Sequence, residues 1–347
     1  MAISLRQSTR VLLVIALLSA CAAPSRTPAP SGLASPDAFV ATGAFSERTR
    51  VVTLDSGVTA TIVAPLRYDR AQPIELILYA LPNGNTTAQT IGRTLAAGDD
   101  WHFDIQHIGA QTRALRTRGL PNAVVVYLEA NTKSWPEWRR LRGYDNANPR
   151  IVAMVNRVRE IVEGTTASNP VPAPMRVTLT GHSGGGSFAW GFIDGQPALP
   201  DWLGRIGFLD SNYSFEPRHG DKIAQWLARR ADHTLVSIAY DDREIMLDGK
   251  KVVSDSGGTW RASHRMLAHF AASTPLVTDT VGPFIRYRSG QMEYVLHTNP
   301  ANRILHTELV GEMNGYMHAL LLRRPDYTES RSVLKPSRAY TPFVDRD

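Results

Sequence analysis

Short, almost continuous apolar runs alternate with helical patterns along the middle of the chain. Four such runs stand out, over Ile74–Ala80, Ala123–Leu128, Met175–Thr180 and Arg205–Leu209. Runs of this kind are typical of strands that are buried on both faces of a parallel sheet. Between the second and third runs, residues 151–162 carry apolar side chains at i, i+3, i+4, i+7 and i+11, which indicates a helix. The alternation predicts an α/β fold with a mostly parallel central sheet and helices on both faces.

Turn residues separate paired alternating runs in three places, and each pair predicts an antiparallel hairpin. The hairpins cover residues 49–63, 245–253 and 284–296. We expect the first at the edge of the sheet and interpret the other two as decorations on its rim. Two more apolar runs, over 234–240 and 303–309, complete the expected set of strands.

The first 20 residues have the pattern of a secretory leader. Basic residues precede the apolar stretch Val11–Leu18, which is too short to cross a bilayer. Leu18-Ser19-Ala20-Cys21 resembles the bacterial lipobox, whose cysteine carries the lipid, and Cys21 is the only cysteine in the chain. The resemblance implies an exported protein anchored to a membrane through Cys21. Because Ala22 stands where an aspartate would retain such a protein in the inner membrane, it also implies the periplasmic face of the outer membrane.

Composition limits the remaining organisation and the partners. Residues 21–44 are rich in Ala, Pro, Ser and Thr and are expected to form a flexible tether. A single domain over 45–324 and a tail over 325–347 follow. The formal net charge of +6 drops by two without Arg6 and Arg10 of the leader, and the other basic residues are interleaved with acids. We therefore expect no nucleic-acid partner.

One glycine-rich segment lies where an expected strand turns into a helix. Gly181-His182-Ser183-Gly184-Gly185 follows Met175–Thr180 and precedes a helical pattern. In this context G-x-S-x-G predicts a sharp turn that lifts the serine hydroxyl above the sheet, beside the amide end of the helix. Here the chain resembles the α/β-hydrolase superfamily, over roughly residues 45–325. The resemblance implies an α/β-hydrolase fold and a serine hydrolase with Ser183 as nucleophile and no cofactor.

The order of the superfamily implies a histidine after the last strand, which takes the proton of the serine. We expect His318 to be this base, since it follows the run 303–309 through a short loop. His297 and His306 come too early, and His306 lies inside an expected strand, where a structural role is favoured. His182, beside the serine, is expected to pack against bound substrate without acting as the base.

The carboxylate that orients the histidine is expected on the loop after the run 234–240. Asp241 is the first choice because it is nearest to the end of the strand, and Asp242 is the alternative next to it. Asp210, which follows the run 205–209, is a third candidate, because some related folds take the acid from the preceding strand.

A serine hydrolase also needs backbone N–H groups that bind the oxyanion of the tetrahedral intermediate. Gly184 is expected to supply one of them. The second is expected from the loop after the run 74–80, near Asn83 or Gly84. This loop lacks the His-Gly-Gly sequence of many esterases and lipases, so the choice between the two residues stays open.

Two tryptophans, Trp135 and Trp138, follow the run 123–128 at the carboxyl edge of the sheet, where ligands bind in open α/β folds. We expect the cluster to stack on sugar rings of a substrate, whereas for either tryptophan alone packing in the core is the favoured alternative. The expected activity is therefore hydrolysis of an acylated carbohydrate or another small ester in the cell envelope. A peptidase or amidase, and a non-catalytic ligand-binding protein on the same scaffold, stay open as alternatives. No metal is expected, because His102 and His107, five residues apart, would point away from each other on a helix.

Overall fold

A computed structural model of the chain describes residues 38–43, 45–55, 57–165, 174–325, 327, 334 and 338–345. The expected leader, Cys21 and most of the expected tether lie outside these ranges, so the anchor stays a prediction. Within the ranges, no helix is both long enough and apolar enough to cross a membrane.

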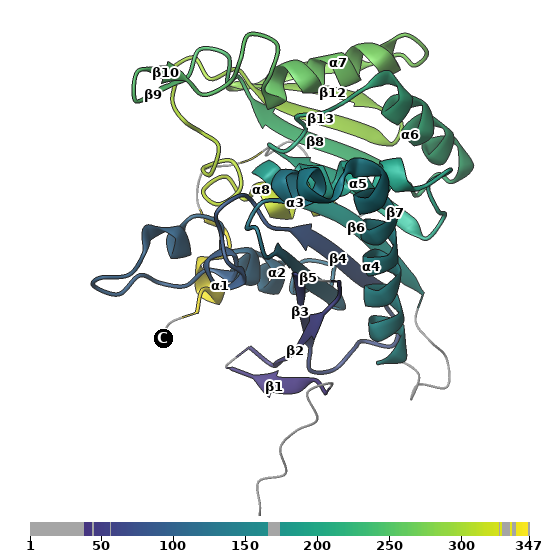
Figure 1. The fold of residues 1–347 in the computed structure, drawn as a ribbon, viewed down its shortest axis with the longest axis vertical. Helices are drawn as coiled ribbons and strands as arrows, with labels where there is room; N and C mark the ends of the chain where they lie inside the picture. The colour runs from purple at the N-terminus through teal and green to yellow at the C-terminus, as the bar shows by residue number, and fades with distance from the viewer. Residues whose placement is uncertain are drawn as a thin grey trace, which may run out of the picture. The chain divides into compact units, whose positions relative to one another are not determined.

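The described residues form one large central sheet of 11 strands (Figure 1). In spatial order the strands are β1 (Val40–Thr42), β2 (Glu47–Thr53), β3 (Val58–Pro65), β5 (Ala123–Ala130), β4 (Ile74–Ala80), β6 (Met175–His182), β7 (Leu203–Leu209), β8 (Thr234–Tyr240), β13 (Met292–His297), β12 (Phe284–Ser289) and β11 (Val277–Val281). All neighbours from β5 to β13 pair in parallel. The outer strands at both edges pair antiparallel.

Helices cover both faces of this sheet (Figure 1). One face is covered by α3 (Trp135–Arg142), α4 (Tyr144–Gly164), α5 (Gly186–Gly195), α6 (Pro217–Arg229) and α7 (Thr259–Ala271). The other face carries α2 (Ile108–Arg116) and α8 (Gly315–Leu321). Shorter helical segments are α1 (Thr87–Ile91), η1 (Trp101–Asp104), η2 (Ser183–Gly185) and η4 (Thr341–Phe343). The architecture expected from the sequence, a mostly parallel central sheet with helices on both faces, is confirmed.

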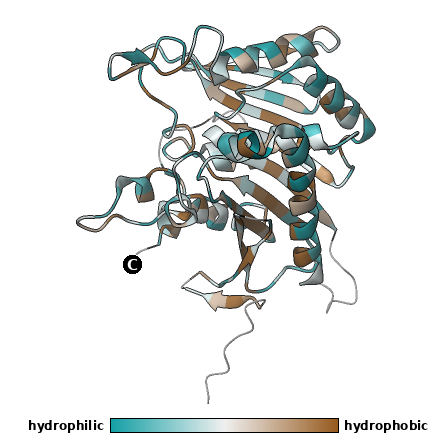
Figure 2. Cartoon of the chain, viewed as in Figure 1, coloured by the Kyte–Doolittle hydropathy of each residue, from teal (hydrophilic) through white to brown (hydrophobic). Residues whose placement is uncertain are grey.

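The layered core explains the continuous apolar runs of the sequence. All seven residues of β4 are buried. Leu76 and Leu78 pack with the helices of one face, whereas Ile77 and Tyr79 pack with those of the other. Successive side chains of a strand point to opposite faces, so a strand covered on both sides needs apolar residues at every position. Figure 2 shows this hydrophobic character along the central strands.

Two expectations about strands were wrong, and they are connected. Residues 303–309 form turns and irregular backbone instead of a strand. The last parallel strand is β13, which pairs with β8 in the register Val295 to Ile238. The hairpin over 284–296 is thus part of the main sheet, because its second strand, β13, pairs with β8. β13 is buried along its whole length. The edge hairpin of β2 and β3 is confirmed, as is the small hairpin of β9 (Met246–Leu247) and β10 (Lys250–Lys251).

Candidate active site

The turn after β6 holds Ser183 at the carboxyl edge of the sheet. Ser183 opens η2 with a φ of 52°, in the left-handed region that non-glycine residues adopt only when the surroundings enforce it. The turn is tight because Gly185 lies against the carbonyl oxygen of Ala80, with which any Cβ would clash. Helix α5 begins directly afterwards and directs its amide end at the same region.

A cleft of about 890 Å³ opens beside this turn. It is lined by Asn83, Pro136, Arg139, Tyr144, Asp145, Asn148, Ser183, Gly184, Ser187, Trp190, Asp194, Ser211, Tyr213, Ser214, Glu216, Arg218 and His219. The side chain of Ser183 is half-buried, and the side chain of Tyr213 lies next to it in the wall of the cleft. The nucleophile candidate is therefore accessible from a cleft whose walls are mainly polar.

The structure joins His306 to Asp210. Nδ1 of His306 lies 2.5 Å from Oδ2 of Asp210, whose residue is 1% exposed and directly follows β7. Thr259, the first residue of α7, donates from Oγ1 to the other oxygen of the Asp210 carboxylate. An aspartate bonded to Nδ1 holds the tautomer in which Nε2 can accept a proton. Asp210, the third candidate from the sequence, is the one that binds a histidine.

His182 connects the serine turn to the loop that carries His306. Its Nε2 donates to the backbone carbonyl oxygen of His306 at 2.9 Å, and the two rings lie 4.3 Å apart between centroids. Burial and the neighbouring His306 lower the pKa of His182 well below its usual value, so its ring is neutral at physiological pH. The residue is 1% exposed, so the expectation that His182 binds substrate was wrong. It supports the histidine instead.

The backbone amides near the serine separate the two oxyanion candidates. The N–H of Gly84 donates to the carbonyl oxygen of Lys133 at 2.8 Å, so the expectation for Gly84 was wrong. The N–H of Leu81 is likewise bonded within the sheet, and proline at 82 has none. Asn83 and Gly184 both line the cleft. They are in close contact, as shown by the clash that a Cβ on Gly184 would make with the side chain of Asn83. Their two N–H groups are the candidates that remain.

His318 is not near this cleft. It lies in α8 and is 7% exposed, and the carbonyl of the next residue, Ala319, accepts a hydrogen bond from Arg205 near the amino end of β7. Ser183 follows the opposite, carboxyl end of the neighbouring strand. Burial and the charge of Arg118 lower the pKa of His318 to about 4. The expectation that His318 is the base was wrong, and the misplaced last strand is the reason.

Asp241 and Asp242 are also separated from any histidine partner. The Asp241 carboxylate is engaged by the guanidinium of Arg243, at 2.8 and 2.6 Å. The Asp242 carboxylate accepts a hydrogen bond from the backbone N–H of Thr259 at 2.8 Å. Neither residue orients His306, so both expectations of a triad acid at these positions were wrong.

Trp135 and Trp138 belong to the core. They are 1% and 0% exposed and lie on the buried face of α3, where Trp135 packs edge-on against Phe188 of α5. The expectation that they stack on substrate was wrong, because the segment after β5 forms a helix whose apolar face turns toward the sheet. The exposed aromatic residues of the cleft are Tyr144 and Tyr213.

Sequence reasoning missed His306 and Tyr213. His306 follows the true last strand, so correct recognition of β13 would have pointed to it. Tyr213 lies three residues after Asp210 in Asp-Ser-Asn-Tyr, and no motif distinguishes it. Its position near Ser183 depends on the parallel pairing of β6 with β7, which the sequence pattern does not encode.

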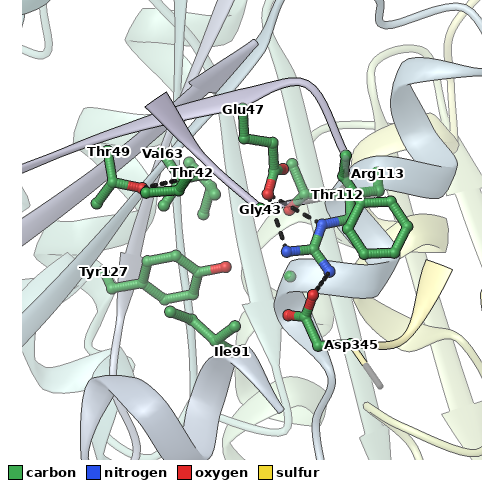
Figure 3. A pocket seen from close by; sticks show the side chains of 13 residues that line it. Thr42, Gly43, Glu47, Thr49, Val63, Ile91, Thr112, Arg113, Tyr127 and Asp345 are labelled. Atoms are coloured by element: carbon green, nitrogen blue, oxygen red, sulfur yellow. Dashed lines mark hydrogen bonds and ion pairs between the residues drawn. The ribbon is translucent and has the colours of Figure 1, made fainter. Parts of the chain in front are cut away.

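A smaller pocket of about 220 Å³ lies between the strands of the β1–β3 edge and α2 (Figure 3). Arg113 borders it, donating to Glu47 and forming an ion pair of 3.0 Å with Asp345. The side chain of Tyr127 also faces this pocket in Figure 3. The described residues that line it include no serine and no histidine, so the nucleophile chemistry belongs to the cleft at Ser183.

No family model and no curated protein matches the chain. Several solved structures have a similar fold. A thermostable esterase has 13% identity and a TM-score of 0.44, covering 76% of this chain and 59% of its own. A mutant feruloyl esterase module from Clostridium thermocellum, complexed with sinapinate, has 12% identity and a TM-score of 0.39, covering 82% and 92%. Thermogutta terrifontis esterase 2, phosphoramylated by tabun, has 9% identity and a TM-score of 0.37, covering 73% and 83%.

The chain spans about three fifths of the length of the first of these structures. With identities and TM-scores this low, the likenesses have no bearing on the reaction. The reaction is therefore inferred from the side chains of the site.

Proposed function

We propose that this protein is a serine hydrolase that cleaves carboxylic esters through an acyl-enzyme. Ser183 is the nucleophile, His306 the general base and Asp210 the carboxylate that orients the imidazole. The observation that carries the proposal is the 2.5 Å contact between His306 and Asp210, made beside a strained serine turn. A serine hydroxyl becomes an effective nucleophile only when an oriented base takes its proton.

The proposed reaction has two halves. In the first, Nε2 of His306 takes the proton of Ser183 while Oγ attacks the ester carbonyl, and the N–H groups of Gly184 and Asn83 bind the oxyanion. The imidazolium then protonates the leaving alcohol as the C–O bond breaks, which leaves an acyl-serine. In the second half, water gives its proton to His306 and attacks the acyl group, and the carboxylic acid departs as Ser183 regains its proton.

The polar cleft supports an acylated carbohydrate or a similarly polar small ester as the substrate. Arg139 and Arg218 both contact Asp194 in its wall. Tyr144 is 53% exposed at the same wall, with the guanidinium of Arg139 over its ring at 4.8 Å. Side chains that offer several hydrogen-bond donors and acceptors beside an aromatic ring suit a hydroxyl-rich alcohol better than a long acyl chain.

Export and lipid anchoring through Cys21 are a separate part of the proposal. The support is the leader pattern, with Cys21 as the only cysteine in the chain. Expression in a bacterium with labelled palmitate should label the wild type and leave Cys21→Ser unlabelled and free of the membrane fraction. A Cys21→Ser protein that still sediments with membranes would contradict the anchor.

A fluorophosphonate probe tests the proposed chemistry directly. The wild type should be labelled at neutral pH, and Ser183→Ala should not. Ser187→Ala, a change at another serine of the same cleft, is the matched control and should be labelled like the wild type. A wild type that resists the probe would reject the hydrolase in favour of a binding protein. Comparison of p-nitrophenyl acetate with p-nitroanilide substrates then distinguishes esterase from amidase activity.

A further inference from the structure

A second carboxylate lies next to Asp210, on the side away from His306. Thr259 links the two acids. Its Oγ1 donates to Oδ1 of Asp210 and lies 3.4 Å from Oδ2 of Asp242, and that same Asp242 oxygen accepts from the backbone N–H of Thr259 at 2.8 Å. A hydroxyl has one proton, so it can donate to only one of the two acids at a time.

The start of α7 is shaped around Asp242. Gly258 precedes the helix with a φ of 89° and lies so close to the Asp242 carboxylate that a Cβ there would clash with it. The N–H groups of Thr259 and Trp260 both favour the charged carboxylate. Asp242 is therefore held in one place by the helix end, and its position relative to Asp210 is defined.

Despite these N–H groups, the surroundings of Asp242 disfavour its charged form. The residue is 3% exposed, and Oδ1 has no hydrogen-bond partner among the described residues. Burial, followed by the charge of Asp210, raises the pKa of Asp242 to about 6. Within the described ranges no cation lies within ion-pair distance of it, because the nearby guanidinium of Arg243 is bound to Asp241. The other titratable groups that interact with it are Tyr213 and Tyr240.

We propose that Asp242 is a positioning residue whose buried charge, held next to Asp210 by Thr259, drives proton transfer from the serine to His306. Two adjacent carboxylates repel each other while the imidazole is neutral. When His306 takes the proton of Ser183, the imidazolium offsets that repulsion, so the charge of Asp242 favours the transition state over the resting enzyme. Asp242 touches neither substrate nor the reacting atoms and acts through Asp210.

Two consequences separate this role from a purely structural one. The first concerns the acid limb of the pH profile of kcat/KM. Because Asp242 gains a proton near pH 6, the limb should be steeper than a single protonation allows. The second concerns stability. The folded state holds a proton on Asp242 between about pH 4 and pH 6, where the unfolded state does not, so this carboxylate destabilises the fold above pH 6.

The test compares Asp242→Asn with Asp241→Asn, a change at its half-buried neighbour that pairs with Arg243. The proposal rests on the proposed function, so kcat/KM on p-nitrophenyl acetate is measured from pH 4.5 to 9. In Asp242→Asn we expect kcat to fall about tenfold with KM unchanged, and the acid limb to become a single protonation at lower pH. Asp241→Asn should follow the wild type.

A further measurement does not depend on activity. Because the buried charge of Asp242 costs stability, Asp242→Asn should melt no lower than the wild type at pH 8. An Asp242→Asn protein with the kcat and the acid limb of Asp241→Asn would overturn the role of Asp242. Failure of the wild type to react with the fluorophosphonate would instead reject the hydrolase, with the melting temperature still reporting the cost of the buried charge.

Discussion

His182 donates a hydrogen bond from Nε2 to the backbone carbonyl oxygen of His306, at 2.9 Å. The residue that precedes the nucleophile thus holds the loop that carries the proposed base. This contact crosses 124 positions of the sequence. It fixes the backbone of His306, while Asp210 fixes its ring.

Loss of the His182 donor should lower kcat more than it raises KM. His182→Leu removes the hydrogen bond and is expected to lower kcat about 10- to 100-fold, because His306 is then free to move away from the serine. His182→Gln keeps an N–H donor and should recover part of the loss. Steady-state kinetics on p-nitrophenyl acetate measures both variants. Equal losses in the two would show that the hydrogen bond is unimportant.

Exchange for glutamine distinguishes the two candidate bases, His306 and His318. His306→Gln should lower kcat about 100- to 10,000-fold, the range expected for removal of a general base. His318→Gln should retain activity within about twofold, because this residue lies at the other end of the strands. Circular dichroism verifies that both are folded. A folded His318→Gln protein without activity would contradict the assignment of His306.

Among the acids, Asp210 should be indispensable. Asp210→Asn is expected to lower kcat about 1,000-fold or more, because an amide cannot hold the imidazole in the required tautomer or stabilise its charged form. Fluorophosphonate labelling rates provide an independent measure and should fall in parallel. If labelling proceeded at the wild-type rate, another carboxylate would have to be the partner of His306.

The hydroxyl of Tyr213 is expected to assist the serine. Tyr213→Phe keeps the ring in the cleft wall but removes the hydroxyl that lies next to Ser183, and we expect kcat/KM to fall about 3- to 30-fold. Tyr144→Phe, at an exposed tyrosine of the same cleft, is the control for loss of a hydroxyl at the wall. A similar decrease in both variants would indicate substrate binding as the shared role.

Acidification should destabilise the fold through His318. Its pKa is lowered to about 4, whereas an unfolded histidine titrates near 6.5, so the unfolded state binds more protons between these values. The stability that this group contributes is fully present above about pH 6.5 and is lost as the pH falls to about 4, a change of about 3 kcal/mol. Urea unfolding at pH 7.5 and pH 5 measures it. The difference should shrink in His318→Gln, and an unchanged difference would assign the acid sensitivity to other groups.

Local patterns were sufficient for the layers of the fold. The continuous apolar runs of β4, β5, β6 and β7 identified the strands at the middle of the sheet, because only residues covered on both faces need apolar side chains throughout. The serine turn was equally local, since strand, glycines and helix follow one another within 21 residues of sequence, from Met175 to Gly195. The local pattern could not predict the burial of Trp135, because that burial depends on which face of α3 packs against the sheet.

The sequence by itself determined the α/β architecture and the segment in which a strained serine would stand. Only the tertiary structure decided which histidine and which acid belong to it. The reason is that a strand becomes the last parallel strand through its neighbour, not through its composition: β13 pairs with β8, and residues 303–309 do not pair at all. Because β13 is the last parallel strand, the candidate base that follows it is His306 and not His318. The position of α7 lets Thr259 donate a hydrogen bond to Asp210, whereas Asp241 forms an ion pair with Arg243.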